Sequence, residues 1–502
     1  MLENFVTRIA IGSCAILTPL LVLPPTVHGT DLDLRKLFNE SIPDSPFINV
    51  IYGYADAMLE HGRDTYGPQK TGLLLSALNR KTLKPLDTRP PVPAGVVDGR
   101  RPGSAGQPLV GSNLQMDQNL LRLLYFLKGL SGENRYPEAA DAELKWFLSS
   151  AQSPETGLLP WGEHLCWDVM SDEVAFCAEE PLHEFSRPWM LWENCFRLAP
   201  QESKRFALGL WNHHVADQKT GELRARVALN SSGSRQPTDC PRQAGFFIRT
   251  WAEAFAHTED DTFLEAIDAV LTGYEKKRRS PAQPARRGIR SPNSCDMLSM
   301  AIDCDGAARK VPQPLRSRLT AFSAREDTSF LSLPHELRGK KAFVKNLDPT
   351  VTGPHVDYTS LWDPKNGRHS TTAVAVMCKS RYENTGKVGY RKLIVEAADA
   401  YLDSLPSDGI DAWPLSFGQA ITLELAAFRI TANRKYHARA FKLGEIAVAE
   451  FFGDSPLPRA SLKTDHYEST TGADTLVLAL AELHLSTRTI TAVRTPANTI
   501  DR

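Results

Sequence analysis

Residues 118–149, QNLLRLLYFLKGLSGENRYPEAADAELKWFLS, alternate apolar and polar positions with the period of an α-helix. Leucines recur at helical spacing through the first half of this stretch: Leu120, Leu121, Leu124, Leu127 and Leu130. A polar Ser-Gly-Glu-Asn turn interrupts the pattern, and Tyr136 then opens a second periodic stretch. Because residues three or four apart share one face of a helix, the pattern predicts a helical hairpin.

The same pattern returns along the chain. It recurs in residues 246–274, 373–402 and 418–452, each time with a polar turn followed by Phe or Tyr, and more loosely in residues 188–214. Paired helices with short turns cannot bury their apolar faces alone, but they can do so when stacked. We therefore predict an all-α fold of helical hairpins arranged as an α/α toroid, with a straight solenoid as the alternative.

Three stretches between these hairpins are predicted to be loops. Residues 84–112 are rich in Pro and Gly, residues 276–296 carry a basic run, and residues 350–370 read TVTGPHVDYTSLWDPKNGRHS. The basic run is a candidate anion-binding rim, or else a solvated loop. Hairpins and loops together form one predicted toroid domain over residues 30–485. We expect the Thr-rich tail, 486–502, to be disordered.

The first thirty residues differ from the rest. An apolar run over residues 9–23 precedes two prolines, and Val27 and Gly29 stand at the −3 and −1 positions of a cleavage site before Thr30. This layout is typical of a secretory signal peptide, and the run is too short for a comfortable membrane span. The sequence predicts a signal peptide over residues 1–29 and a secreted or periplasmic protein. A short N-terminal anchor is the alternative.

Composition limits the classes of partner. The chain is 42% hydrophobic and 23% charged, with a formal net charge of −1. This balance gives no overall electrostatic reason to bind nucleic acid or a membrane surface. We therefore expect no nucleic-acid partner, and membrane contact only through an uncleaved N-terminal segment.

Chemically active side chains concentrate in residues 161–214. Five of the nine tryptophans and four of the thirteen histidines lie there, and the stretch WGEHLCWD, residues 161–168, sets a histidine and carboxylates between two tryptophans. Indole faces stack on sugar rings, so the window suits carbohydrate binding, with core packing as the alternative. The candidate substrate-binding residues are Trp161, Trp167, Trp189 and His183.

His164 and Glu184 are also candidate metal ligands. With His183 or one of His213 and His214, they offer ligand types suited to a borderline divalent ion such as Mn²⁺ or Zn²⁺. The chain has no HExxH or comparable spacing. A hydrogen bond between His164 and Glu184 across two helices is the alternative.

A series of motifs in this region resembles a known family. They are GSNLQMDQNLLRLL (111–124), TGLLPWGEHLCWD (156–168), HEFSRPWMLWE (183–193) and LWNHHVADQKTGELRARV (210–227). In order and spacing they resemble the α/α-toroid pectate lyases of polysaccharide lyase family 2 and related exported toroid proteins, over residues 110–275 and more weakly over 456–480. The resemblance implies a carbon–oxygen lyase that cleaves an anionic polysaccharide, a pectate-like polyuronate, by β-elimination.

The resemblance also implies roles for residues. It implies an arginine base and a Mn²⁺-type ion bound by two histidines and a glutamate, of which His164 and Glu184 match two ligands. We therefore expect a divalent cation, Mn²⁺ or Ca²⁺, as the cofactor. An Arg-His pair is expected next, but this chain has Arg224-Ala225-Arg226-Val227. Arg224 or Arg226 is therefore the candidate base, or a clamp on substrate carboxylates. A base role requires a buried, cationic site, because the free pKa of arginine is above 12.

Two further readings stay open. Asp357 and Asp411 lie beside aromatic residues in predicted loops, and paired carboxylates of this kind serve glycoside hydrolysis. Helix caps and turns are the alternative explanation for such aspartates. A non-catalytic toroid that binds glycans is the third reading.

Overall fold

The computed structural model describes residues 45–99, 101–103, 105–231, 235–279, 293–348, 355–365, 369–487, 495–496 and 500–502. Its α-helices are α2 (Ile48–Glu60), α3 (Gln118–Ser131), α4 (Arg135–Trp146), α5 (Trp192–Leu198), α6 (Pro200–Gly209), α7 (Pro241–Thr258), α8 (Thr262–Arg279), α9 (Ser294–Ala308), α10 (Leu315–Leu331), α11 (Thr371–Thr385), α12 (Val388–Tyr401), α13 (Pro414–Thr431), α14 (Arg434–Ala447) and α15 (Ala473–Ser486). Short π-helical turns follow three of them: η1 (Phe147–Ala151), η2 (Leu210–His214) and η3 (Val448–Phe452). A 3₁₀ turn, η4 (Ser469–Thr471), precedes α15.

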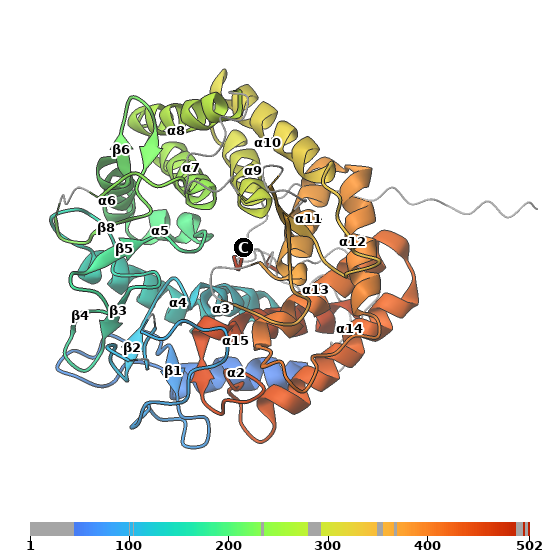
Figure 1. Ribbon diagram of the computed structural model, residues 1–502. Coiled ribbons are helices and arrows are strands. Elements are labelled where there is room, and N and C mark those ends of the chain that lie inside the picture. Colours follow the sequence, from blue (N-terminus) through green and yellow to red (C-terminus); the bar gives the residue numbers. More distant parts are fainter. Residues whose placement is uncertain are drawn as a thin grey trace, which may run out of the picture.

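The helices form a closed ring of hairpins (Figure 1). Helix α3 packs on α4, α5 on α6, α7 on α8, α9 on α10, α11 on α12, and α13 on α14. Within the ring, α7 contacts α9, α9 contacts α11, α11 contacts α13, and α13 contacts α15. Helix α15 also packs on α3, so the last hairpin meets the first. The predicted α/α toroid is confirmed, and the straight solenoid is not the arrangement of this chain.

The predicted polar turns end the first helix of four hairpins. At each turn one residue adopts the left-handed backbone conformation: Gly132 (φ 77°), Glu259 (φ 54°), Gly386 (φ 66°) and Ala432 (φ 56°). Its N–H donates to a carbonyl four residues earlier in the helix, which stops the helix and reverses the chain. The turn is therefore short enough for the second helix to pack back on the first.

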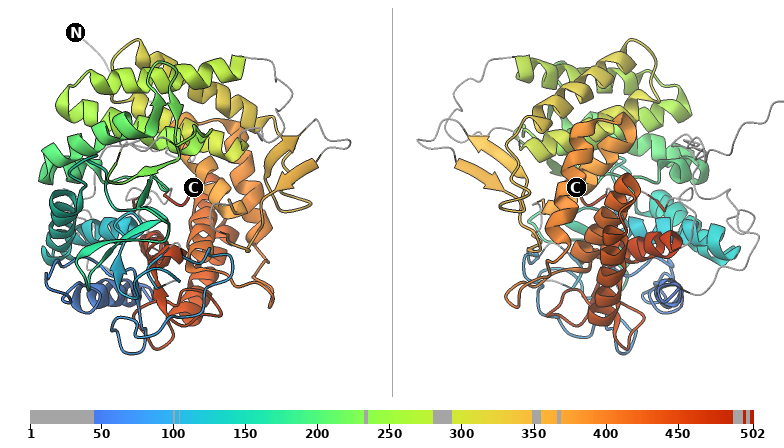
Figure 2. Two further views of the ribbon diagram at one scale, coloured as in Figure 1. Left: turned by 60° about the vertical axis from the view of Figure 1, so that its left-hand side comes forward. Right: turned by 90° about the vertical axis from the view of Figure 1, so that its right-hand side faces the viewer.

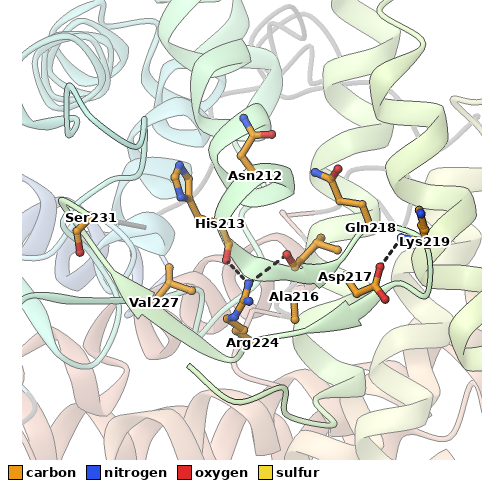
Figure 3. A pocket seen from close by; sticks show the side chains of 10 residues that line it. Asn212, His213, Ala216, Asp217, Gln218, Lys219, Arg224, Val227 and Ser231 are labelled. Atoms are coloured by element: carbon orange, nitrogen blue, oxygen red, sulfur yellow. Dashed lines mark hydrogen bonds between the residues drawn. The ribbon is translucent and has the colours of Figure 1, made fainter. Parts of the chain in front are cut away.

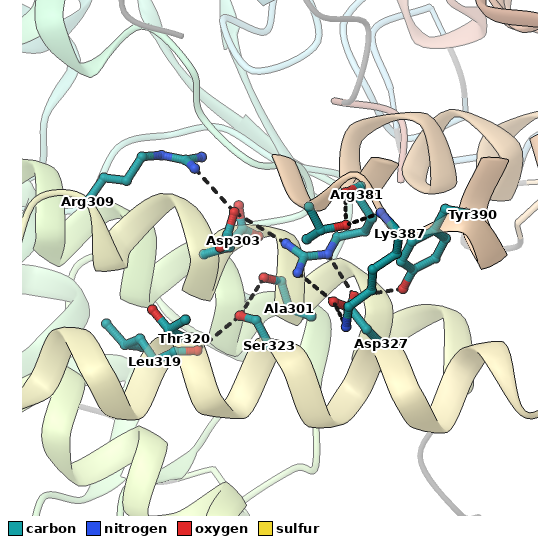
Figure 4. Close-up of polar contacts among 12 residues, drawn as sticks. Ala301, Asp303, Arg309, Leu319, Thr320, Ser323, Asp327, Arg381, Lys387 and Tyr390 are labelled. Atoms are coloured by element: carbon teal, nitrogen blue, oxygen red, sulfur yellow. Dashed lines mark hydrogen bonds and ion pairs between the residues drawn. The ribbon is translucent and has the colours of Figure 1, made fainter. Parts of the chain in front are cut away.

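A repeated tyrosine–aspartate contact joins neighbouring hairpins. The aromatic residue that opens the second helix is buried, and its hydroxyl donates to an aspartate of the preceding outer helix: Tyr136 to Asp56 (2.8 Å), Tyr390 to Asp327 (2.7 Å) and Tyr436 to Asp399 (2.9 Å). Asp327 also accepts hydrogen bonds from Arg381 (2.8 and 2.9 Å) and Lys387 (2.8 Å) (Figure 4). Burial alone would raise the pKa of Asp327, but these partners hold it below its usual value.

Short antiparallel strands connect the helices. They are β1 (Ala77–Leu78), β2 (Gly111–Ser112), β3 (Leu165–Asp168), β4 (Glu173–Phe176), β5 (Leu182–Glu184), β6 (Val215–Asp217), β7 (Glu222–Leu223), β8 (Arg226–Ala228), β9 (Val344–Asp348), β10 (His355–Tyr358) and β11 (Tyr467–Glu468). Strand β3 lies between β2 and β4, while the pairs β5–β8, β6–β7, β9–β10 and β1–β11 form separate ribbons. The β9–β10 hairpin, which takes up part of the predicted 350–370 loop, projects from one end of the ring (Figure 2).

Several predicted segments lie outside the described residues. They include the predicted signal peptide, 1–29, and most of the basic run, because residues 280–292 are not described. Within the described ranges, the helices lack the combination of length and apolar character that a membrane crossing requires. Within the predicted tail, Ile500 and Arg502 are buried, and this end of the chain lies near the middle of the ring (Figure 1).

Candidate functional site

Strands β5 and β8 bring a predicted acid and a predicted arginine together. Their antiparallel register sets Glu184 opposite Arg226 and His183 opposite Val227. Arg226 Nε donates to Glu184 Oε2 at 2.9 Å. The Arg226 side chain remains 37% exposed, whereas that of Glu184 is 10% exposed. The pair therefore has a buried acidic end and an accessible basic end.

His164 reaches the same carboxylate from the loop before β3. Its Nε2 lies 3.2 Å from Glu184 Oε2. The loop approaches β5 closely at Gly162 (φ 97°), where a Cβ would lie 2.2 Å from the Glu184 carbonyl oxygen, so only glycine fits. Asn113 Nδ2 donates to the carbonyls of Gly162 (2.6 Å) and Leu165 (3.0 Å) and so holds both ends of the loop.

Glu163 completes a cluster with metal-ligand chemistry. One ligand atom from each of Glu163, His164 and Glu184 can be chosen so that all lie within 4.8 Å of one another. His164 Nε2 is buried and has no hydrogen-bond partner within the described residues, which fits a nitrogen directed at a cation. Two carboxylates and an imidazole suit a divalent ion of the Mn²⁺ type. These residues can therefore hold such an ion.

The charge of Glu184 is stabilised at this position. Burial alone would raise its pKa, but the contacts of His164 and Arg226 outweigh that effect and hold the pKa below its usual value. Gln243, in the first turn of α7, adds an amide nitrogen 3.4 Å from Glu184 Oε1. Glu184 is therefore an ionised carboxylate at neutral pH, available to a cation or to Arg226.

The other face of the same strands carries a buried hydrogen-bond chain. Trp161 Nε1 donates to His183 Nε2 at 3.0 Å, and an indole N–H can only donate. His183 Nδ1 must then donate to His214 Nε2 (2.7 Å), and His214 Nδ1 to the Arg224 carbonyl (2.8 Å). Burial lowers the pKa of His214 to about 4, and it lowers the pKa of His183 well below its usual value. Both imidazoles are therefore neutral links of the core.

Arg224 lies away from the cluster. Its guanidinium donates to the backbone carbonyls of His213 (3.3 Å), Val215 (3.2 Å) and Arg235 (2.9 Å). Together with β6 and its turn it lines a separate cavity of about 550 Å³ (Figure 3). Of the two predicted arginines, the structure therefore brings Arg226 to Glu184, and it uses Arg224 to hold the β6–β8 region together.

The predicted sugar-stacking residues are buried. Trp161 and Trp189 are 1% exposed, Trp167 is 8% exposed and His183 is fully buried. Trp161 packs on Phe185 and on Trp189, with ring centroids 5.5 and 5.0 Å apart. In this structure these rings fill the core beneath the cluster, which favours the packing alternative over sugar stacking.

The two alternative catalytic aspartates have different partners on different elements. Asp411 accepts hydrogen bonds from the backbone N–H groups of Ala94 (3.0 Å) and Lys463 (2.9 Å), and thereby ties two loops together. Asp357, in β10, forms an ion pair with Lys345 at 3.1 Å. The geometry thus gives Asp411 a structural use, and it leaves Asp357 half-exposed on the projecting hairpin.

Sequence reasoning did not assign three residues of the site. Glu163 directly precedes His164 in WGEH, and this adjacency was the available signal. Asn113 lies in the motif GSNLQMD, but its contact with the 162–165 loop joins residues about fifty positions apart, so it depends on tertiary packing that the sequence does not show. Gln243 is distant in sequence and carries no pattern that points to Glu184.

Comparison with known proteins concerns the same part of the chain. Residues 102–236 match the family model of periplasmic pectate lyases, and this segment contains the three cluster residues, Glu163, His164 and Glu184, together with Arg226. The pectate disaccharide-lyase of Dickeya dadantii (strain 3937) is 24% identical over 173 residues, 34% of this chain. The match covers 29% of that protein's length.

Solved structures with a similar course of the chain are much more distant in sequence. A D-mannose isomerase has 9% identity and a TM-score of 0.48, covering 89% of this chain and 100% of its own. The α-1,6-mannanase GH76A of Salegentibacter sp. HEL1_6 has 8% identity and a TM-score of 0.43, covering 86% and 98%. An unsaturated glucuronyl hydrolase specific for heparin has 10% identity and a TM-score of 0.41, covering 88% and 98%. Similarity at this level says nothing about the substrate of this chain.

Proposed function

We propose that this chain is an exported polysaccharide lyase that cleaves a pectate-like polyuronate by β-elimination. The observation that carries the proposal is the cluster of Glu184 with His164 at 3.2 Å and Arg226 at 2.9 Å. Glu163 adjoins these residues, and the cluster lies inside the segment that matches the periplasmic pectate lyases.

The reaction sets the demands on the site. In a 4-linked uronate, the proton on C5 is acidified by the neighbouring carboxylate. A base removes that proton, the C4=C5 double bond forms, and the C4–O bond breaks as the leaving sugar oxygen gains a proton. Glu163, His164 and Glu184 would hold a divalent cation, which when bound withdraws electron density from the uronate carboxylate and so acidifies the C5 proton.

Arg226 is the residue we assign to the substrate side of the site. Its exposed guanidinium can reach a bound sugar, whereas its Nε stays fixed on Glu184. From that position it can serve as a bidentate clamp on the uronate carboxylate. The base role would require that a cation held by Glu184 make the surroundings of the guanidinium cationic, because a guanidinium paired only with a carboxylate stays charged. Arg224 is not suited to either role, because its guanidinium is already bonded to backbone carbonyls.

Ultraviolet absorbance of the C4=C5 double bond tests the proposal directly. The protein is incubated with polygalacturonate and other uronate polymers, with and without Mn²⁺, and Arg226→Gln is compared with Arg224→Gln. We expect absorbance to rise with the unaltered chain and with Arg224→Gln, but not with Arg226→Gln. New reducing ends without absorbance would instead indicate hydrolysis and make Asp357 and Asp411 the next substitutions. Binding without either product would support a glycan-binding toroid.

A further inference from the structure

The middle of the ring is occupied by a distant part of the same chain. Residues 500–502 lie there (Figure 1), and they contact helices from opposite sides of the ring. Asp501 contacts α13 and α15, and Arg502 contacts α7 and α9. A segment with partners on four helices occupies the ring axis rather than its surface.

The Asp501 carboxylate is held by groups that recognise carboxylates. Arg187 Nη1 lies 3.2 Å from Asp501 Oδ1, and the Thr475 hydroxyl donates to Oδ2 at 2.7 Å. The Asp501 side chain is 3% exposed. A guanidinium and a hydroxyl on the two oxygens of one buried carboxylate form a specific anion site.

The neighbouring Arg502 completes the contact. Its guanidinium donates to Asp303 (2.6 Å) and to the Ser299 hydroxyl (2.6 Å), while Arg242 donates to its main-chain oxygen (3.2 Å). Asp303 and Ser299 both belong to α9. The segment is thus held by an anion site at one residue and a cation site at the next.

These contacts adjoin the Glu184 cluster. Arg187, which binds Asp501, lies three residues after Glu184 in the chain. Arg242, which binds Arg502, directly precedes Gln243, and Gln243 contacts Glu184. The groups that bind Asp501 and Arg502 are therefore close in sequence to Glu184 and to its neighbour Gln243.

We propose that Arg187 and Thr475 form a carboxylate-binding subsite for a uronate unit of the substrate, and that residues 500–502 fill this subsite until substrate displaces them. The proposal rests on the proposed function for the nature of the ligand. A hexuronate carboxylate has the same two oxygens as Asp501, so it can form the same ion pair with Arg187 and accept the same hydrogen bond from Thr475. The tail and the substrate then compete for one site.

Competition has a measurable consequence. When a site is open for only a fraction of the time, the apparent dissociation constant of a ligand rises by the reciprocal of that fraction. A tail that fills the subsite for about nine-tenths of the time would weaken binding about tenfold. Removing the Asp501 carboxylate should therefore lower the apparent dissociation constant by the same factor.

The test is calorimetric titration of the whole chain with saturated trigalacturonate. No metal is added, so that binding is measured without cleavage of the ligand. Asp501→Ala should bind about tenfold more tightly than the unaltered chain. Adding Arg187→Gln to Asp501→Ala should remove the gain. Asp403→Ala, which deletes one exposed negative charge elsewhere, is the matched control and should leave the affinity unchanged.

Equal affinity of Asp501→Ala and the unaltered chain overturns the proposal, whether or not thermal stability falls, because the tail would then only brace the ring. Absence of trigalacturonate binding by both chains also overturns it. If Asp501→Ala fails to fold, Asp501→Asn provides the same comparison, since it removes the charge but keeps an oxygen for Thr475. Failure of the proposed lyase activity is separate, because it shows as missing absorbance while tighter binding by Asp501→Ala persists.

Discussion

The two faces of the β5–β8 ribbon carry consecutive residues into opposite environments. His183 points into the core, where it passes one hydrogen bond from Trp161 to His214. Glu184, the next residue, points to the other face and meets His164 and Arg226. Successive side chains of a strand project to opposite faces, so adjacent residues can have unrelated roles. Here one face is a neutral hydrogen-bonded core, and the other is a charged site.

Electrostatics separates the two faces further. On the core face, burial favours the neutral imidazole and lowers the pKa of His183 and of His214. On the site face, the contacts of His164 and Arg226 favour the ionised carboxylate and lower the pKa of Glu184 despite burial. A cation therefore has negative charge to bind on the site face, whereas the core-face imidazoles already use both ring nitrogens in hydrogen bonds.

The largest expected effect is the difference in turnover between substitutions of Arg226 and of Arg224. If the proposed function holds, Arg226→Gln should lower the turnover of polygalacturonate by about 10³-fold, because it removes the charged group that we propose contacts the reacting sugar. Arg224→Gln should retain turnover and lower the free energy of unfolding by about 1–2 kcal/mol, because Arg224 holds backbone carbonyls. Absorbance-based rates and urea unfolding of both variants measure the two effects. The reverse pattern would reverse our assignment of the two arginines.

The next effect is a dependence of stability on pH, which we expect from His214 on the core face. The pKa of His214 is about 4 in the folded chain and about 6.5 when unfolded, so the unfolded state binds the proton between these values. This residue should therefore lower stability as pH falls from about 6.5 to 4, by about 3 kcal/mol in total. His214→Gln keeps a donor and an acceptor but cannot titrate.

The measurement is urea unfolding of both chains in one buffer series from about pH 7.5 to about pH 4.5. This range includes most of the pH interval over which His214 should change the free energy of unfolding. The difference between the two unfolding free energies should shift in favour of His214→Gln as pH falls, and should be constant above about pH 6.5. A difference that does not change with pH would mean that His214 is not held neutral by the core.

The sequence predicted the ring more completely than the site. Helical periodicity and polar turns located the hairpins of 118–149, 246–274, 373–402 and 418–452, because each hairpin depends on local spacing and a turn. Stacking of those units is expected from their unpaired apolar faces, whereas closure into a ring rather than a straight solenoid depends on the contact between α15 and α3. The long segments gave a clear signal because a helix repeats its buried face over many residues.

The site gave a weaker signal. Strands β5 and β8 have three residues each, too few to show an alternating pattern, so sequence could not tell which of His183 and Glu184 faces the core. The choice between Arg224 and Arg226 depends on the register that sets Arg226 opposite Glu184. The contacts of Asp501 join parts of the chain hundreds of residues apart, which no local pattern reports.

A smaller effect tests Glu163 as a ligand on the site face. Glu163→Gln should weaken Mn²⁺ binding by about 10- to 100-fold, because it removes one of two negative charges near His164. Glu173→Gln, an exposed glutamate of β4, is the matched control and should bind Mn²⁺ as the unaltered chain does. Calorimetry or the electron-spin signal of free Mn²⁺ reports the affinity without turnover. Equal losses in both variants would indicate general surface charge rather than a ligand set.

The smallest effect has the opposite sign and concerns the contact between Arg226 and Glu184. Arg226 and a cation would share Glu184 as their partner, so the guanidinium would repel an ion bound by Glu163, His164 and Glu184. A unit charge and a divalent ion about 8 Å apart interact by about 1 kcal/mol in water. Arg226→Gln should therefore bind Mn²⁺ about fivefold more tightly while it loses turnover. A variant that loses both would mean that Arg226 holds Glu184 in place for the cation, and the site face would then depend on the ion pair for its geometry. Tighter binding with lost turnover would instead separate the two tasks, cation binding by Glu163, His164 and Glu184, and contact with substrate by Arg226.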